Sequence, residues 1–234
     1  MKAFIFARGG SKGVPKKNIR LIHGRPLIEW SISQALSVDD ITEVIVSTDC
    51  DEVADVARSC GATTPFMRPA KFATDNASEL DAWKHAIVST REIFGQVPDP
   101  FISIPTTAPL RKKIDIENCI KAYKEDSVDL VVTCTVSHRS PWFNMVEMDI
   151  NNNVSILMDG GQNIHRRQDA QKVYDLTTVA YVGNSNYLLD TNSLFSGKVK
   201  GVEVPYERSL DIDTEFDLVI AEKILADTYR KNNV

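Results

Sequence analysis

Histidine and cysteine are scarce in this 234-residue chain, with four of each. The spacings of Cys50, Cys60, Cys119 and Cys134 match neither a zinc site nor a redox pair, and the histidines are scattered. No apolar run approaches the ~20 residues of a membrane-spanning helix, and the first apolar run is too short for a secretory signal. We therefore expect a cytoplasmic protein with reduced thiols, without a histidine metal site and without a membrane segment.

The chain also has fewer basic than acidic residues. It contains 27 lysines and arginines and 32 aspartates and glutamates, which gives a net charge of −5. This balance argues against a general nucleic-acid or anionic-membrane surface. A content of 43% hydrophobic and 25% charged residues is ordinary for a globular protein and argues against disorder. Without internal repeats or low-complexity segments, we expect a single domain over residues 1–234.

Short apolar segments rich in strand-forming residues alternate with segments of helical periodicity along most of the chain. The expected strands are 3–7, 43–49, 101–104, 129–135 and 178–182, and the expected helices are 26–36, 51–60, 78–94, 115–124 and 214–229. Such alternation is typical of an α/β fold with a mainly parallel sheet. We expect a three-layer, Rossmann-like sheet with its site at the carboxyl ends of the strands.

The alternation of strand and helix patterns is interrupted between residues 137 and 172. Alternating apolar residues at 143–148, a turn at Asn151–Asn153 and a second apolar segment at 154–158 predict an inserted β-hairpin. A hairpin of this size has too little core of its own, so its apolar side chains should pack on the body or on another subunit.

A glycine-rich basic segment, Arg8–Asn18, follows the first strand directly. Three glycines allow a sharp turn that brings backbone N–H groups close to a ligand, and Arg8, Lys12, Lys16 and Lys17 add four positive charges. The spacing fits neither a Walker loop nor the G-x-G-x-x-G dinucleotide motif. In an acidic protein this local charge favours a small anionic ligand such as a nucleoside triphosphate, with a basic surface turn as the alternative.

Two acids near the C-terminus form the counterpart of the basic segment. If residues 210–213 are extended, Asp211 and Asp213 lie on the same face, where two carboxylates can share one hard cation. Magnesium is expected, because it prefers oxygen ligands and bridges to phosphates. The alternative is a helix N-terminus with Asp213 or Thr214 as the cap and Glu215 favoured by the helix dipole.

Six segments together resemble the acylneuraminate cytidylyltransferases, also called CMP-N-acetylneuraminate synthetases, and the resemblance extends over almost the whole chain. The segments are Ala7–Asn18, Val46–Asp49, Arg68–Pro69 with Thr74–Ser78, Pro105–Arg111, Arg167–Gln168 and Ser209–Thr214. The resemblance implies a Rossmann-like nucleotidyltransferase that uses CTP and Mg²⁺. In the implied reaction, the anomeric hydroxyl of a nonulosonic, sialic-acid-like 2-keto sugar acid attacks the α-phosphorus of CTP, and pyrophosphate leaves without a covalent intermediate.

The resemblance also implies residue roles. Arg8, Lys16 and Asp211 are the expected catalytic residues, and Asp211 and Asp213 the magnesium ligands, with Asp75 assisting. CTP is expected to contact Arg8, Gly9, Gly10, Ser11, Lys12, Lys16, Asn18, Arg68, Asp75, Ala77 and Ser78. The acceptor sugar is expected to contact Thr106, Thr107, Arg111, Arg167, Gln168 and Tyr174.

The inserted segment corresponds in the resemblance to a dimerisation element whose arginine, here Arg166 or Arg167, reaches the partner's site in a homodimer. A solvated basic turn is the alternative for these arginines. Two departures from sialate-specific members, Ile104 and Thr177–Thr178, disfavour N-acetylneuraminate and leave a legionaminate-like, pseudaminate-like or other modified nonulosonate open. A deoxy-manno-octulosonate-type cytidylyltransferase and a non-catalytic nucleotide-binding protein are the remaining alternatives.

Overall fold

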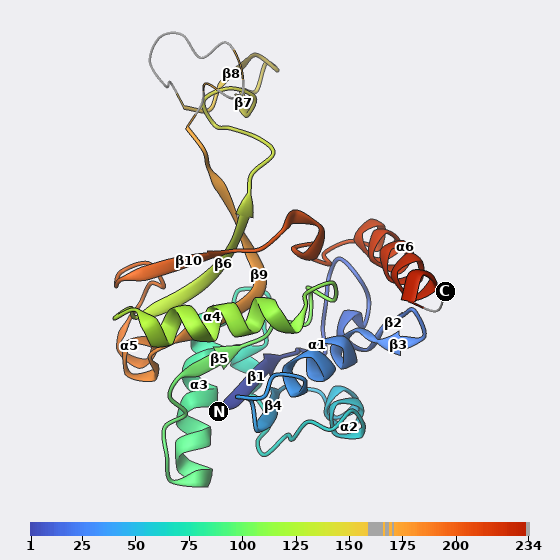
Figure 1. Cartoon of the computed structure of the whole chain (residues 1–234), viewed down its shortest axis with the longest axis vertical. Coiled ribbons are helices and arrows are strands. Elements are labelled where there is room, and N and C mark those ends of the chain that lie inside the picture. Colours follow the sequence, from blue (N-terminus) through green and yellow to red (C-terminus); the bar gives the residue numbers. More distant parts are fainter. Residues whose placement is uncertain (159–165, 167–168, 170, 233–234) are drawn as a thin grey trace.

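A six-stranded sheet forms the centre of the protein in the computed structural model, which describes residues 1–158, 166, 169 and 171–232. The strand order is β10-β6-β9-β5-β1-β4 (Figure 1). The strands are β1 (Lys2–Phe6), β4 (Glu43–Ser47), β5 (Phe101–Ser103), β6 (Leu130–Val136), β9 (Tyr174–Gly183) and β10 (Val199–Glu203). All neighbouring pairs are parallel except those of β9, which runs antiparallel between β5 and β6.

Helices cover both faces of this sheet. They are α1 (Leu27–Leu36), α2 (Asp51–Ser59), α3 (Glu79–Phe94), α4 (Lys113–Glu125), α5 (Ser185–Asp190) and α6 (Glu215–Asn232). Side chains of α1, α2 and α4 share one buried cluster, and those of α3 and α5 share another on the opposite face. In β1, Ala3 and Ile5 belong to the first cluster and Phe4 to the second, as the period of two requires for a strand buried on both sides. The expected three-layer α/β architecture is confirmed.

The ends of the helices follow from local sequence signals. The Ser78 side chain accepts a hydrogen bond from the Leu80 N–H at the start of α3, and Gly95 ends this helix at φ 73°. Thr214 and Asp217 form reciprocal hydrogen bonds at the start of α6, where the Asp217 carboxylate accepts the Thr214 N–H at 2.7 Å and the Asp217 N–H reaches the Thr214 hydroxyl at 3.3 Å. This capping box sets where α6 begins, directly after the two predicted metal ligands.

A third apolar cluster attaches α6 to the body. Ile212, Leu218, Ala221 and Leu225 pack there against residues of the N-terminal third, including Val14. The short strands β2 (Leu21–Ile22) and β3 (Arg25–Pro26) and the 3₁₀ turns η1 (Lys17–Ile19), η2 (Ala70–Phe72) and η4 (Tyr206–Arg208) complete the body. This packing places the acidic segment before α6 next to the basic segment after β1, although the two segments are far apart in the chain.

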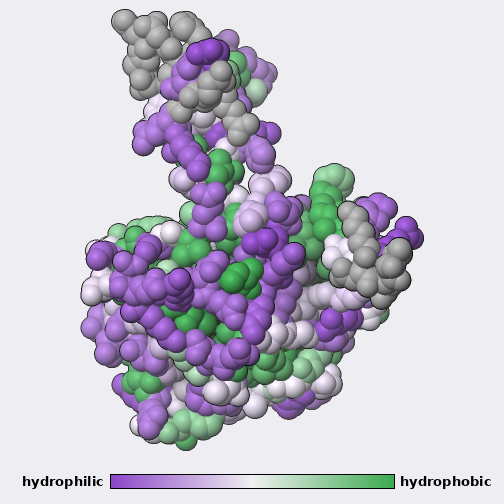
Figure 2. All heavy atoms as spheres, in the orientation of Figure 1, coloured by the Kyte–Doolittle hydropathy of each residue, from purple (hydrophilic) through white to green (hydrophobic). Residues whose placement is uncertain are grey.

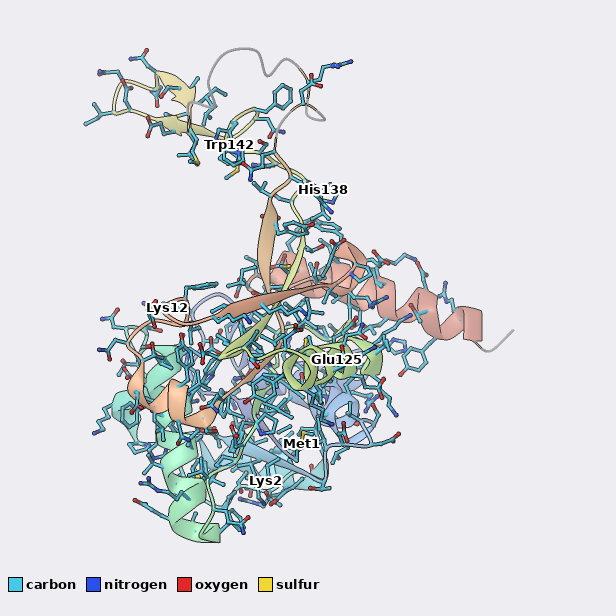
Figure 3. All side chains as sticks on the ribbon, turned by 60° about the vertical axis from the view of Figure 1, so that its left-hand side comes forward. Met1, Lys2, Lys12, Glu125, His138 and Trp142 are labelled. Atoms are coloured by element: carbon cyan, nitrogen blue, oxygen red, sulfur yellow. The ribbon has the colours of Figure 1, made fainter. Side chains whose placement is uncertain are left out.

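The inserted segment between β6 and β9 stands away from the body (Figure 1). It contains the hairpin of β7 (Val146–Met148) and β8 (Val154–Ile156), as the alternating pattern predicted. We call the described residues of this insertion, Ser137–Met158, Arg166, Asp169 and Gln171–Val173, the arm. Figure 3 shows Trp142 on the arm and Lys12 on the body. Among the described residues, no helix has the length and apolar character needed to cross a bilayer.

Candidate active site

The basic segment after β1 and the acidic segment before α6 are in direct contact. The Lys17 ammonium donates a hydrogen bond to the Ile212 carbonyl at 2.7 Å and lies 3.2 Å from Asp213 Oδ1. At Gly13, an added Cβ would lie 2.1 Å from the Asp213 carbonyl oxygen, so the two backbones approach more closely than any other residue type permits. Positive charge and carboxylates therefore meet at the carboxyl edge of the parallel strands.

Asp75 holds two cations of the basic segment in place. Its carboxylate lies 2.7 Å from Arg8 Nη1 and 2.8 Å from Lys12 Nζ, and these hydrogen bonds lower the Asp75 pKa. The Gly9 N–H is directed to Asp49 Oδ1 at 2.9 Å. The N–H groups of Arg8, Lys12 and Gly9 are thus bonded to carboxylates. The same groups could bind a phosphate instead, because a phosphate carries more charge and more acceptor oxygens than a carboxylate.

A cleft with a volume of about 300 Å³ opens beside these residues. Predicted residues that line it are Arg8, Gly10, Ser11, Asn18, Arg68, Asp75, Ala77, Ser78, Thr106 and Thr107. Lys17 also contributes to its wall. Its size is at the lower end of the range for ligand pockets.

A chain of hydroxyl and amide groups connects the cleft wall to both segments. Thr106 Oγ1 donates to Asn18 Oδ1 at 2.6 Å, and Asn18 Nδ2 donates to the Arg8 carbonyl at 2.8 Å. On the other side, Thr107 Oγ1 lies 3.2 Å from Thr178 Oγ1, which donates to Asp211 Oδ1 at 3.0 Å. These bonds orient the basic segment and Asp211 relative to each other. Neither the expected strand at 178–182 nor the departure at Thr177–Thr178 predicts the contact of Thr178 with Asp211.

Asp211 and Asp213 differ in their surroundings. Burial raises the Asp211 pKa, to which the nearby Asp213 charge adds, whereas hydrogen bonds from Thr107 and Thr178 lower it. The Asp213 side chain is 71% exposed. Two carboxylates that repel each other beside a cleft lined by Arg8, Lys17 and Arg68 fit a divalent cation, which would relieve that repulsion. Among the described residues no group of three or more metal-binding side chains converges, but Mg²⁺ needs only one or two carboxylates when phosphates and waters complete its shell.

Arg68 lines the cleft and is almost fully buried, with only 6% of its side chain exposed. Its Nε and Nη2 atoms have no hydrogen-bond partner within the described part of the chain, and Nη2 lies 4.0 Å from Asp49 Oδ1. Burial lowers its pKa, and Asp49 opposes this. Since buried donors without acceptors cost about 1–3 kcal/mol each, the geometry favours a ligand that supplies acceptors here.

Several predicted residues lie away from this cleft. Lys16 is turned toward Glu52, with its ammonium 2.7 Å from Oε2, and this partner raises the Lys16 pKa. Tyr174 lies on β9 beside the arm, paired with Val136 and contacted by the Lys172 ammonium 4.7 Å from its ring centre. Arg167 and Gln168 are outside the described residues.

Arg111 is also separated from the cleft, because its side chain is folded into the interior. Its guanidinium donates to Ser31 Oγ at 2.8 Å and to the Pro105 carbonyl, and burial lowers its pKa to about 9. In this position it supports the Pro105–Thr107 loop and does not line the cleft. Ile104 is likewise fully buried in the core, so its side chain does not face the cleft.

Comparisons with known proteins agree over nearly the whole chain. A family model described as cytidylyltransferase matches residues 3–223. The chain is 37% identical over 223 residues to the CMP-N,N'-diacetyllegionaminic acid synthase of Campylobacter jejuni, covering 95% of this chain and 93% of that protein. It is 31% identical over 216 residues to the pseudaminic acid cytidylyltransferase of another Campylobacter jejuni strain, covering 92% of each.

A solved structure of CMP:2-keto-3-deoxy-manno-octonic acid synthetase complexed with CTP has a similar fold. Its TM-score is 0.73 at 17% sequence identity, covering 97% of this chain and 99% of that one. At this identity the likeness concerns the fold alone.

Proposed function

Because this chain belongs to the cytidylyltransferase family, we propose that it transfers CMP from CTP to the anomeric hydroxyl of a nonulosonic, sialic-acid-like 2-keto sugar acid and releases pyrophosphate. The observation that carries the proposal is the contact of the Lys17 cation with the Ile212–Asp213 segment at the edge of a cleft that Arg8 and Arg68 line. The names of the legionaminic and pseudaminic acid relatives support a nonulosonate acceptor over deoxy-manno-octulosonate.

The residues of the basic segment bind and orient the triphosphate. Arg8 and Lys12 would exchange the Asp75 carboxylate for phosphate oxygens, while Lys17, paired with Asp213, contributes its charge to the cleft wall. Displacement at phosphorus requires little covalent chemistry from the protein, so positioning and charge neutralisation provide most of the rate acceleration. The preformed bonds among Asn18, Thr106 and Arg8 keep this cationic wall in place.

Asp211 and Asp213 would hold Mg²⁺ at the junction with the triphosphate. When bound there, this ion neutralises phosphate charge and stabilises the departing pyrophosphate. Thr178 keeps one oxygen of Asp211 engaged at 3.0 Å and so fixes the direction of the carboxylate. Orientation by such a hydrogen bond is the usual way in which a metal-binding carboxylate is positioned.

Pyrophosphate release tests the proposal directly. The purified protein with Mg²⁺ should release pyrophosphate from CTP when it is given a 2-keto nonulosonic acid, and mass spectrometry should find the CMP sugar. A panel of N-acetylneuraminate, legionaminate-type, pseudaminate-type and deoxy-manno-octulosonate acceptors ranks the acceptor class. Tight CTP binding without product across this panel would instead indicate a nucleotide-binding protein, and turnover only with another nucleotide would refute the assignment to CTP.

The arm supports a second part of the proposal, a homodimer. Val146 and Met148 of β7 pair with Ile156 and Val154 of β8, which gives one apolar face, and these side chains are between 44% and 64% exposed. Figure 2 shows apolar side chains on the arm and where it meets the body. A two-stranded hairpin is marginally stable alone, so we propose that a second copy covers this face and that Arg166 or Arg167 of the inserted segment reaches the partner's cleft.

Met148→Lys should shift the protein from dimer to monomer. A lysine ammonium on the covered face would have to be desolvated, whereas at 64% exposure it costs the monomer little. Glu147→Lys is the matched control, because the neighbouring side chain points to the opposite face of the hairpin. Sedimentation velocity should show a smaller species for Met148→Lys alone, with kcat/KM falling as the dimer is lost. Equal sedimentation of both variants and the parent would refute a dimer through this face.

A further inference from the structure

The connection from β10 to α6 carries both proposed metal ligands, and its residues 209–214 lie outside any helix or strand (Figure 1). The capping box of α6 fixes the end of this segment. In its middle, the Ile212 N–H donates to the Thr107 carbonyl at 2.8 Å. The start of the segment is fixed by Arg208, the last residue of η4, to which the proposed transfer assigns no role.

Arg208 binds the Asp115 carboxylate of α4 at two points. Its Nε donates to Oδ2 at 2.9 Å and its Nη2 donates to Oδ1 at 2.8 Å. The Asp115 side chain is only 2% exposed, and its Oδ2 also accepts the Lys112 N–H at 2.9 Å. Asp115 is therefore held by the first turn of α4. A planar guanidinium in a two-point contact has a fixed orientation, which a lysine ammonium cannot reproduce.

The position of Arg208 in the chain gives this contact a consequence for Asp211, which follows three residues later. No regular element separates the two residues, so a shift of the chain at Arg208 is passed on to Asp211. Mg²⁺ requires near-octahedral geometry with oxygen ligands at about 2.0–2.1 Å, and it tolerates little displacement of a carboxylate. The bond from Thr178 to Asp211 likewise forms only if the backbone brings the carboxylate to it.

We infer that Arg208 is a positioning residue for the metal-binding acids: by anchoring the acidic segment to Asp115, it sets where Asp211 lies and thereby the affinity of the site for Mg²⁺. Loss of a group that orients metal ligands costs about 10- to 100-fold in metal affinity or activity. This inference rests on the proposed function, because Mg²⁺ at Asp211 and Asp213 is part of that proposal.

Two other roles are compatible with the same contact. The ion pair could act only on the stability of the fold, or the positive charge of Arg208 could act on the two acids through space. Arg208→Lys separates charge from geometry, because it keeps the charge and loses the two-point contact. Ile120→Val separates stability from geometry, because it removes a buried methyl group from α4 and leaves the Arg208–Asp115 contact in place.

The first experiment measures pyrophosphate release over a Mg²⁺ titration at saturating CTP and acceptor. Arg208→Lys and Arg208→Met should each raise the half-saturating Mg²⁺ concentration by about 10-fold or more, while the rate at saturating Mg²⁺ stays close to the parental rate. Asp115→Asn should have a similar effect, and adding Arg208→Met to it should change little, because both substitutions remove one contact. Ile120→Val should keep the parental Mg²⁺ requirement.

The second experiment requires no turnover. Hydrogen exchange of the metal-free protein, followed by mass spectrometry, reports local opening of the peptide that contains the Ile212 N–H. This peptide should exchange faster in Arg208→Lys than in the parent and at the parental rate in Ile120→Val. Circular dichroism should show that both variants are folded.

The inference and the proposed function fail in different ways. A parental Mg²⁺ requirement in Arg208→Lys, an equal change in Ile120→Val, or unchanged exchange at Ile212 would each overturn the role of Arg208 while leaving the cytidylyltransferase proposal intact. A parent protein that releases no pyrophosphate from CTP with any acceptor would refute the proposed function itself. Arg208→Lys carries the test even if Arg208→Met fails to fold.

Discussion

Asp211→Asn is expected to lower kcat/KM for CMP transfer by about 10³-fold, the upper range for removing one group that stabilises charge in a transition state. The substitution removes the partly buried carboxylate that, with Asp213, would hold Mg²⁺. Its shape is kept, and the asparagine carbonyl can still accept the Thr178 hydroxyl that Asp211 accepts at 3.0 Å. The effect should therefore appear in turnover and in the Mg²⁺ concentration that the reaction requires, with an unchanged melting temperature.

Asp227→Asn is a suitable control for this variant. Asp227 is on α6, where it pairs with Lys223 at 3.1 Å away from the cleft. Pyrophosphate release over a Mg²⁺ titration should give parental values for Asp227→Asn and a strongly reduced maximum for Asp211→Asn. Parental turnover in Asp211→Asn would remove the metal site from the mechanism.

Gly13→Ala is expected to impair both stability and activity. The new methyl group would lie 2.1 Å from the Asp213 carbonyl oxygen, a backbone atom, so the basic and acidic segments must move apart. Overpacking of this kind costs about 1–3 kcal/mol of unfolding free energy. Displacement of the two segments by about 1 Å can lower kcat/KM by about 100-fold, because the phosphate donors and the carboxylates no longer face a common point.

Gly10→Ala provides the stability control from the same segment, since a Cβ there meets no atom within 4 Å. Urea denaturation should show a lower midpoint for Gly13→Ala and a parental midpoint for Gly10→Ala. If Gly13→Ala unfolded at the parental midpoint and retained parental kcat/KM, the close contact between the two segments would be required for neither stability nor activity.

Local patterns in the sequence predicted most elements of the fold. Expected strands and helices agree with β1, β4, β5, β6, α1, α2, α3, α4 and α6 to within a few residues, because their apolar period and their caps are encoded within each segment. The strand β10 was missed. It lies at the sheet edge, where it pairs with β6 alone, and its Val-Lys-Gly-Val-Glu sequence lacks a continuous apolar run.

The family assignment was also accessible from sequence, and the comparisons confirm it. The directions in which individual side chains point were harder to predict from the sequence. Arg111 and Lys16 have the residue type expected of anion-binding groups, yet Arg111 folds inward beneath Pro105 and Lys16 pairs with Glu52. Glu79, which the sequence analysis did not single out, also lines the cleft. In the sequence it carries only the signal of an acid at a helix start, which is common and does not by itself indicate a ligand.

The order of residues along the chain was enough to specify a cationic loop after one strand, a pair of acids before the last helix and a hairpin inserted between two strands, because each depends on neighbours a few positions away. The meeting of Lys17 with Asp213, 196 residues later, the place of β9 between β5 and β6, and the gathering of Arg8, Arg68 and Thr106 around one cleft depended on how the sheet and α6 pack. Contacts of this kind arise from burial of apolar surface shared by distant segments, and that burial exists only once the whole chain has folded.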